Sequence, residues 1–285
     1  MATTDIFHIS GGLVPARKAI KFLTGNTDDF IEVNAFAATR VSANDAVGTF
    51  TAWIMIADDT ITGTIIGNGD DSIVEFLEIL VESGLLTVRI TDATVVQVVT
   101  QANGDALKRH RWYHIAVVQK ADGVGPKLYI DGSLIASTND TTTDVDSWFA
   151  ELDGIDKGLI GASNKTGNSA ITNEFTGSIS DVKYWNVALT DAQVLSDFEE
   201  QIPDDITGTP GDLKNHWDFD DDLIDNVAAE NGTNTGGGAI LVNNWAEFSS
   251  RLAYDTGTPI VADTLQCWSS GNNNQMGHAI VIQAA

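Results

Sequence analysis

Carboxylates are the most abundant side chains in this sequence that could take part in chemistry, with 40 Asp and Glu among 285 residues. Hydrolysis of a glycosidic bond with retention of configuration needs two carboxyl groups about 5 Å apart. The nearest grouping is the run from Glu75 through Glu78 to Glu82, with spacings of three and four. These spacings differ from the two-residue alternation of a strand and favour a solvated helix or loop edge. We therefore do not expect this run to be catalytic.

Nucleophilic and zinc-binding residues form no catalytic pattern. The histidines are His8, His110, His114, His216 and His278. They include no H-E-x-x-H pairing, and the sequence has no G-x-S-x-G elbow. His114 alternates with core positions, so we expect a satisfied interior histidine. The single cysteine, Cys267, excludes an intrachain disulfide framework and is expected to be a small buried hydrophobe. Together these patterns predict that the protein is not an enzyme.

The charge balance excludes two classes of partner. The formal net charge is −25 and the pI is near 4.2. Binding to nucleic acid or to an anionic membrane needs clustered Lys and Arg. The one basic cluster, residues 108–111, is expected at a strand entrance, facing acidic loops. No run of about eighteen apolar residues is present, and the first residues lack a Sec signal pattern. We expect no nucleic-acid partner and no membrane insertion.

Short β-branched runs separated by Gly, Asn and Asp predict many strands. Residues 50–56 (FTAWIMI) are apolar on both faces, which is typical of a central strand in a two-sheet sandwich. Residues 127–130 lead through Asp131-Gly132 into another apolar run, which predicts a hairpin with a type I′ turn. The glycine-rich residues 67–71 (GNGDD) are expected to form a turn. One helix is predicted after Thr190, which forms a capping box with Gln193.

Five segments, in sequence order, resemble motifs of the concanavalin A-like jelly-roll superfamily, in its laminin-G-like and pentraxin-like branch. They are residues 20–33, 50–53 (FTAW), 111–118 (RWYHIAVV), 128–132 (LYIDG) and 175–190 (FTGSISDVKYWNVALT). The resemblance implies an all-β fold, a concanavalin A-like jelly-roll β-sandwich with one short helix near residues 191–200.

The same resemblance suggests three segments. Residues 1–19 fall outside the motifs and are expected to be an N-terminal docking arm, and residues 20–202 form the sandwich. Residues 203–285 are expected to be a C-terminal extension that completes or packs on the same sandwich. The alternative is the start of a truncated second copy, for which fewer than ninety residues are short.

Members of this branch often hold Ca²⁺ on loops at the rim of a sheet, through carboxylate, amide and backbone oxygens. The loop before residue 175 and the opening loop occupy corresponding positions. The implied ligands are Asn168, Asn173, Glu174, Asp28 and Asp29. Chance is the competing explanation, because a chain with forty acids places oxygens near many turns and Asn and Asp favour turns for backbone reasons. No cofactor is required, and Ca²⁺ is the one that the resemblance allows.

Three tryptophans in less regular contexts could stack on sugars or anchor an interface, although burial is the competing expectation. They are Trp148, Trp245 and Trp268. The N-terminal arm contains Leu13, Val14 and Pro15, which we expect to mediate assembly.

These observations predict a non-catalytic structural or recognition protein of a virus or phage particle, such as a capsid decoration or fibre-associated protein. We expect it at the virion surface, bound to other virion proteins or to itself as a homo-oligomer, and in contact with surface glycans. The alternative is an exported, calcium-dependent carbohydrate-binding or adhesion module of a bacterium, at the cell surface or outside the cell. A weaker alternative is a glycoside hydrolase with an unrecognised carboxylate pair.

Overall fold

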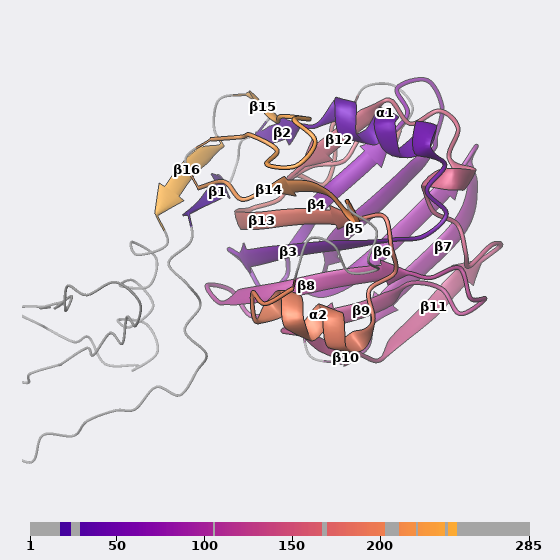
Figure 1. Ribbon diagram of the computed structural model, residues 1–285, viewed down its shortest axis with the longest axis horizontal. Coiled ribbons are helices and arrows are strands. Elements are labelled where there is room, and N and C mark those ends of the chain that lie inside the picture. Colours follow the sequence, from indigo (N-terminus) through magenta and orange to yellow (C-terminus); the bar gives the residue numbers. More distant parts are fainter. Residues whose placement is uncertain are drawn as a thin grey trace, which may run out of the picture. The chain divides into compact units, whose positions relative to one another are not determined.

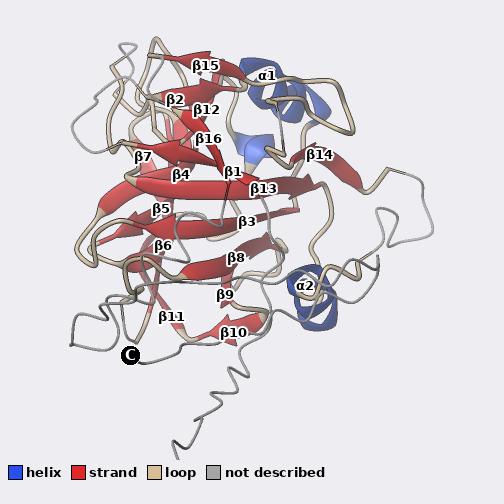
Figure 2. Cartoon of the chain, turned by 90° about the vertical axis from the view of Figure 1, so that its left-hand side faces the viewer, coloured by secondary structure: helices blue, strands red, loops and turns tan. Residues whose placement is uncertain are grey.

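Two antiparallel sheets form the structure, a computed structural model that describes residues 18–23, 29–104, 106–166, 170–202, 211–220, 222–236 and 239–243. Within these ranges each sheet has eight strands, and two short helices, α1 (Asn34–Ala43) and α2 (Asp191–Phe198), accompany them (Figure 1). The sheets stack as a sandwich, which confirms the predicted all-β class (Figure 2).

The first sheet, sheet A, is centred on the long strands β3 and β13. Its order is β10 (Ser133–Ile135), β9 (Lys127–Ile130), β8 (Trp112–Gln119), β3 (Gly48–Ile56), β13 (Gly177–Trp185), β1 (Lys18–Phe22) and β16 (Ile240–Asn243), and β14 (Leu213–Trp217) pairs with the second half of β13. Every residue of β3 is buried, as the apolar sequence of this strand predicts.

The second sheet, sheet B, holds the strands on which the candidate site lies. Its order is β11 (Ser137–Thr142), β7 (Val95–Ala102), β6 (Leu85–Asp92), β5 (Phe76–Glu82), β4 (Thr62–Gly69), β12 (Lys157–Ile160), β2 (Phe30–Glu32) and β15 (Thr233–Thr235). The opening segments β1 and β2 therefore lie in different sheets.

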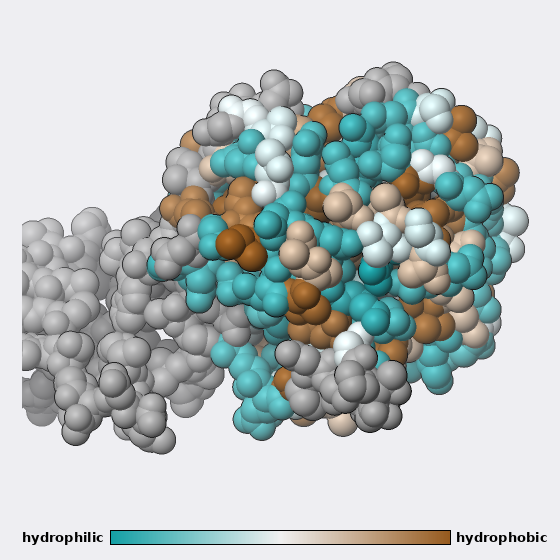
Figure 3. Space-filling model, turned by 45° about the horizontal axis from the view of Figure 1, so that its top comes forward, coloured by the Kyte–Doolittle hydropathy of each residue, from teal (hydrophilic) through white to brown (hydrophobic). Residues whose placement is uncertain are grey.

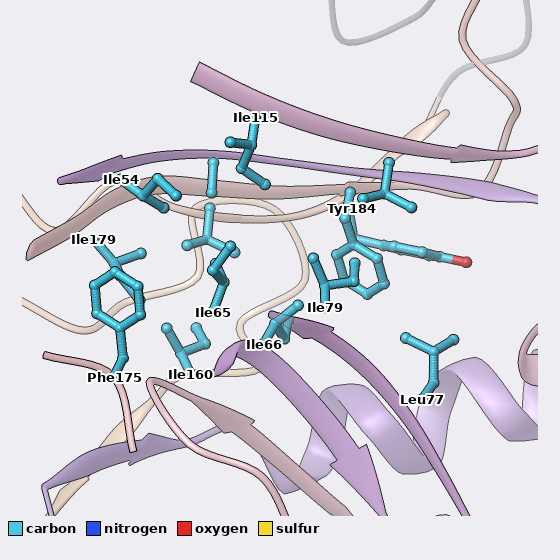
Figure 4. Packing of buried hydrophobic residues seen from close by; sticks show 14 of the residues in the cluster. Ile54, Ile65, Ile66, Leu77, Ile79, Ile115, Ile160, Phe175, Ile179 and Tyr184 are labelled. Atoms are coloured by element: carbon cyan, nitrogen blue, oxygen red, sulfur yellow. The ribbon is translucent and has the colours of Figure 1, made fainter. Parts of the chain in front are cut away.

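Aliphatic side chains from the two sheets meet in one core. Ile54, Ile115 and Ile179 point from sheet A toward Ile66 and Ile79 of sheet B (Figure 4). Burying a side chain of this size contributes about 1.5–3 kcal/mol relative to leaving it exposed. The alternation of side chains along each strand directs the intervening residues to the outer faces, where function can be located.

Local signals produce the predicted helix and hairpin. In α2, the Thr190 hydroxyl accepts a hydrogen bond from the Gln193 backbone N–H, which completes the capping box. Between β9 and β10, Asp131 (φ 50°) and Gly132 (φ 73°) both adopt the left-handed conformation that the type I′ turn requires.

Helix α1 corrects the prediction of a single helix. Its N-cap, Val33, makes no side-chain capping bond, so the sequence carries no start signal. Packing stabilises it instead: the buried Phe36 ring contacts Phe50, Tyr184 and Trp217 edge-on, at centroid distances of 5.3–5.9 Å. Tertiary contacts can form a helix whose local signals are weak.

Strands from the end of the sequence pair with both sheets. β14 and β16 extend sheet A, and β15 pairs with β2 in sheet B. Residues 203–210, 221, 237–238 and 244–285 of the predicted C-terminal extension lie outside the described residues, as does the arm at residues 1–17. None of the helices in the described ranges is long and apolar enough to span a membrane.

Candidate functional site

Polar side chains gather on the outer face of strands β5, β6 and β7. In β5, Leu77, Ile79 and Val81 enter the core, so Glu78, Leu80 and Glu82 point outward. The register then places Arg89 opposite Glu78, Thr87 opposite Leu80, and Gln101 opposite Thr87. We call the six outward side chains Glu78, Leu80, Glu82, Thr87, Arg89 and Gln101 the outer β5–β7 face.

Hydrogen bonds link four of these side chains across three strands. Arg89 Nη2 forms an ion pair with Glu82 Oε1. Gln101 Nε2 donates to Glu82 Oε2 at 3.3 Å and to Thr87 Oγ1 at 3.1 Å. The side chains of Arg89 and Glu82 remain 25% and 28% exposed. Guanidinium, carboxylate and amide groups are thus held at the surface, with donors and acceptors side by side.

Glu78 is a buried anchor at one side of this face. It is 0% exposed, and its Oε1 accepts hydrogen bonds from Thr64 Oγ1 at 2.6 Å and from Asn173 Nδ2 at 2.9 Å. Lys165 Nζ lies 3.6 Å from Glu78 Oε2. The prediction that residues 75–82 form a solvated helix or loop edge was wrong, because residues 76–82 form strand β5 and Glu78 is buried on its outer side.

The segment that carries Lys165 and Asn173 lies directly over β4. A Cβ atom at Gly67 would come within 2.7 Å of the Ala162 carbonyl oxygen, and one at Gly69 would overlap the Asn164 carbonyl. The glycines at 67 and 69 therefore belong to a strand under a close backbone crossing, and the prediction of a turn beginning at residue 67 was wrong. This crossing segment bounds the outer β5–β7 face on its β4 side.

The implied calcium ligands are only partly within the described residues. Asn173 turns its amide nitrogen toward Glu78, Glu174 is half-buried, and Asp29 is buried. Asn168 and Asp28 lie outside the described residues. In the part of the chain that the structure describes, no three His, Cys, Asp or Glu side chains are grouped so that they could hold a metal ion. Calcium binding stays a prediction.

Tryptophan stacking receives no support from the described residues. Trp148 is 0% exposed, packed against Phe50 and Phe149, with its ring nitrogen donating to Tyr184 Oη at 3.3 Å. Its assignment as a ligand or interface aromatic was therefore wrong. Trp245 and Trp268 lie outside the described residues, as do Leu13, Val14 and Pro15 of the arm. Among the residues that can be placed, no Phe, Tyr or Trp is classed as exposed.

A second group of titratable side chains lies on the outer side of sheet A, under α2. His114 Nε2 lies 3.0 Å from Asp197 Oδ2, and Lys183 Nζ lies 2.9 Å from Asp197 and 3.0 Å from Asp181. Burial alone would raise the pKa of Asp197, but Lys183 and His114 outweigh it and hold that pKa well below its usual range. His114 is 1% exposed, as predicted for an interior histidine, so this group ties α2 to the sheet.

The basic cluster at residues 108–111 also serves the fold. Arg111 Nη2 forms an ion pair with Asp131 at 2.8 Å, and its guanidinium lies 4.5 Å from the centre of the Tyr113 ring. The backbone N–H of Arg109 donates to Asp59. This arrangement matches the predicted role of basic side chains that face acidic loops at a strand entrance.

Neither carboxylate arrangement near sheet B suits glycoside hydrolysis. Glu78 and Glu82 are four residues apart on one strand, about 13 Å along the backbone, against about 5–9.5 Å for the two known geometries. Asp70 and Glu75 are buried, and each accepts a hydrogen bond from a backbone N–H. For Glu75 the donor is Gly154 N, 2.6 Å from Oε1. The outer β5–β7 face thus offers hydrogen-bond donors and acceptors to a polar ligand.

Comparisons with known proteins bear on the fold. A family model described as the concanavalin A-like lectin/glucanases superfamily matches residues 25–195. A search of curated proteins finds no match.

Two solved structures resemble the chain at low sequence identity. One is the Ruminococcus gnavus IT-sialidase CBM40 bound to alpha2,3 sialyllactose, with 13% identity, a TM-score of 0.51, and coverage of 63% of this chain and 96% of that one. The other is a candidate carbohydrate-binding protein from Bacteroides ovatus, with 17% identity, a TM-score of 0.50, and coverage of 80% of this chain and 60% of that one. These likenesses show the jelly-roll fold, and the family match covers most of the sandwich. The chain belongs to the concanavalin A-like lectin/glucanase superfamily.

Proposed function

We propose that this protein is a non-catalytic carbohydrate-recognition protein that binds glycans on the outer β5–β7 face. The observation that carries the proposal is the network in which Glu82, Arg89 and Gln101 lie partly exposed and Gln101 is held by the buried Thr87 hydroxyl, so that these groups are positioned by one another before a ligand arrives. Sugars present hydroxyl groups that both donate and accept hydrogen bonds, so a rigid mixed surface of this kind is complementary to them.

Relatives support the same function. One similar structure is named as a carbohydrate-binding module with a bound sialyllactose, and another as a candidate carbohydrate-binding protein. The spacing of the carboxylates on sheet B supports binding without cleavage.

A glycan microarray with the full chain, followed by titration of the best glycan, tests this function. Replacing Gln101 with Ala removes the amide that connects Glu82 to Thr87, and we expect about a tenfold loss of affinity, the scale of one well-placed hydrogen bond. Gln201→Ala is the matched control, because Gln201 is exposed next to α2, which packs by sheet A. Equal binding by wild type and Gln101→Ala would contradict the assignment of the face.

We also propose that glycan recognition serves a virus or phage particle, with the protein at the virion surface. The support is in the sequence: strong acidity and a single cysteine. In this proposal the N-terminal arm, which contains Leu13, Val14 and Pro15, is the docking element.

Light scattering of the full chain and of a variant without residues 1–17 tests the particle setting. A trimer or larger species that dissociates without the arm is the expected result. The competing exported module predicts a monomer in both cases and sugar binding that EDTA abolishes, through ligands such as Asn173 and Glu174.

A further inference from the structure

We infer that the outer β5–β7 face selects neutral sugars and rejects sugars that carry a carboxylate or sulfate group. This inference rests on the proposed function, and it specifies the ligand class of the same face. It is drawn from how the charges of this face are paired.

Each basic side chain on the outer side of sheet B that the structure describes has a carboxylate partner. Arg89 pairs with Glu82, Lys165 lies 3.6 Å from Glu78, and Lys157 lies 3.3 Å from Asp71. Arg89 and Lys157 are the two basic residues in the strands of this sheet. A neighbouring carboxylate therefore compensates each of these three cations, in a chain that as a whole carries −25.

A face whose cations are already paired discriminates against anionic ligands for two reasons. Recognition of a carboxylate or sulfate works best with a guanidinium whose fork is open to the ligand, and here Glu82 occupies part of the Arg89 fork. An added anion would also meet Glu82 at short range, where like charges repel. Uncharged hydroxyl groups meet neither penalty, since they can donate to Glu82 and accept from Arg89 or Gln101.

The pairing of these charges also predicts a ligand class that differs from the ligand of a similar solved structure. A similar fold has been solved with sialyllactose, an acidic sugar. At 13% identity the ligand does not transfer with the fold, and the charges of the face decide the ligand class.

The first test compares matched pairs of glycans on one microarray, each neutral glycan beside the same glycan capped by sialic acid or sulfate, with the full chain as probe. We expect capping to weaken binding by about tenfold or more, as for a like charge placed at an interface. Equal or stronger binding of capped glycans would overturn the inference and leave glycan recognition intact. No binding to either class would overturn the proposed function and the inference together.

A charge variant makes the test more specific. Glu82→Gln keeps a side chain of the same length that can still hydrogen-bond to Gln101, but it leaves Arg89 without its carboxylate. We expect the ratio of capped to neutral binding to rise about tenfold. Glu199→Gln removes the same charge from an exposed site beyond α2 and should leave the ratio unchanged. An unchanged ratio in folded Glu82→Gln would overturn the inference.

Discussion

At the scale of single residues, the role of a charged side chain depends on its partner and on whether the pair is buried. Lys183 is buried between Asp181 and Asp197, whereas Arg89 pairs with Glu82 at the surface. The first pairing stabilises the fold and the second leaves polar atoms exposed for a ligand. The abundance of carboxylates is visible in the sequence, but these roles are not, because the register of the strands decides which side chains become partners.

Replacing Lys183 with Met should therefore destabilise the protein strongly. The change leaves two buried carboxylates without their cation, and we expect a loss of about 3–5 kcal/mol in the free energy of unfolding. Urea denaturation measures it. The matched control is Lys120→Met, because Lys120 is 60% exposed and pairs with Asp122 at the surface, where a pair contributes about 0–1 kcal/mol. Similar losses in the two variants would contradict the structural role of Lys183.

Glu75 gives a pH-dependent prediction. Burial raises the pKa of Glu75. The hydrogen bond from the Gly154 backbone N–H opposes this rise in pKa, and the nearby Asp92 and Asp70 add to it. A raised pKa means that this group stabilises the fold below its unfolded pKa and that the contribution is lost as pH rises through the folded pKa. Glu75→Gln should therefore raise the melting temperature at pH 7, with a gain that vanishes below about pH 4.5, the ordinary value. Glu199→Gln controls for net charge, and a gain independent of pH would refute the explanation.

At the scale of elements, some helices and turns form from local sequence signals, whereas others depend on contacts with distant parts of the chain. The capping box of α2 and the Asp131-Gly132 turn are local, so the sequence predicts both. Helix α1 depends on Phe36 packing against distant rings. In β5 the apolar Leu80 takes an outward position between Glu78 and Glu82, which hides the alternation of the strand. These elements, and hence the outer β5–β7 face, could not be predicted from local patterns.

Gly67 tests the crossing segment. Gly67→Ala would place a methyl group 2.7 Å from the Ala162 carbonyl oxygen, so the segment over β4 must shift. We expect a loss of about 1–3 kcal/mol, typical of overpacking. Gly104→Ala is a stringent control, because a Cβ there meets nothing within 4 Å although its φ of 123° adds backbone strain. A smaller loss at Gly67 than at Gly104 in thermal unfolding would contradict the tight crossing.

At the scale of the whole molecule, the charged residues of sheet B differ from the strongly acidic chain as a whole. The face of the sandwich seen in Figure 3 carries hydrophilic residues with scattered hydrophobic ones. The net charge of −25 disfavours anionic partners. On the outer side of sheet B, each described cation has a carboxylate partner. The family and the sandwich were predicted from five motifs, while the pairing that distinguishes this member of the family required the structure.

The most direct test of glycan recognition is an NMR titration of the full chain with the best neutral glycan from the microarray. The account predicts that backbone amide signals of β5, β6 and β7 shift, with the largest changes near Glu82, Arg89 and Gln101. Shifts confined to sheet A or to the region of α2 would contradict it, because they would place the ligand on the opposite side of the sandwich.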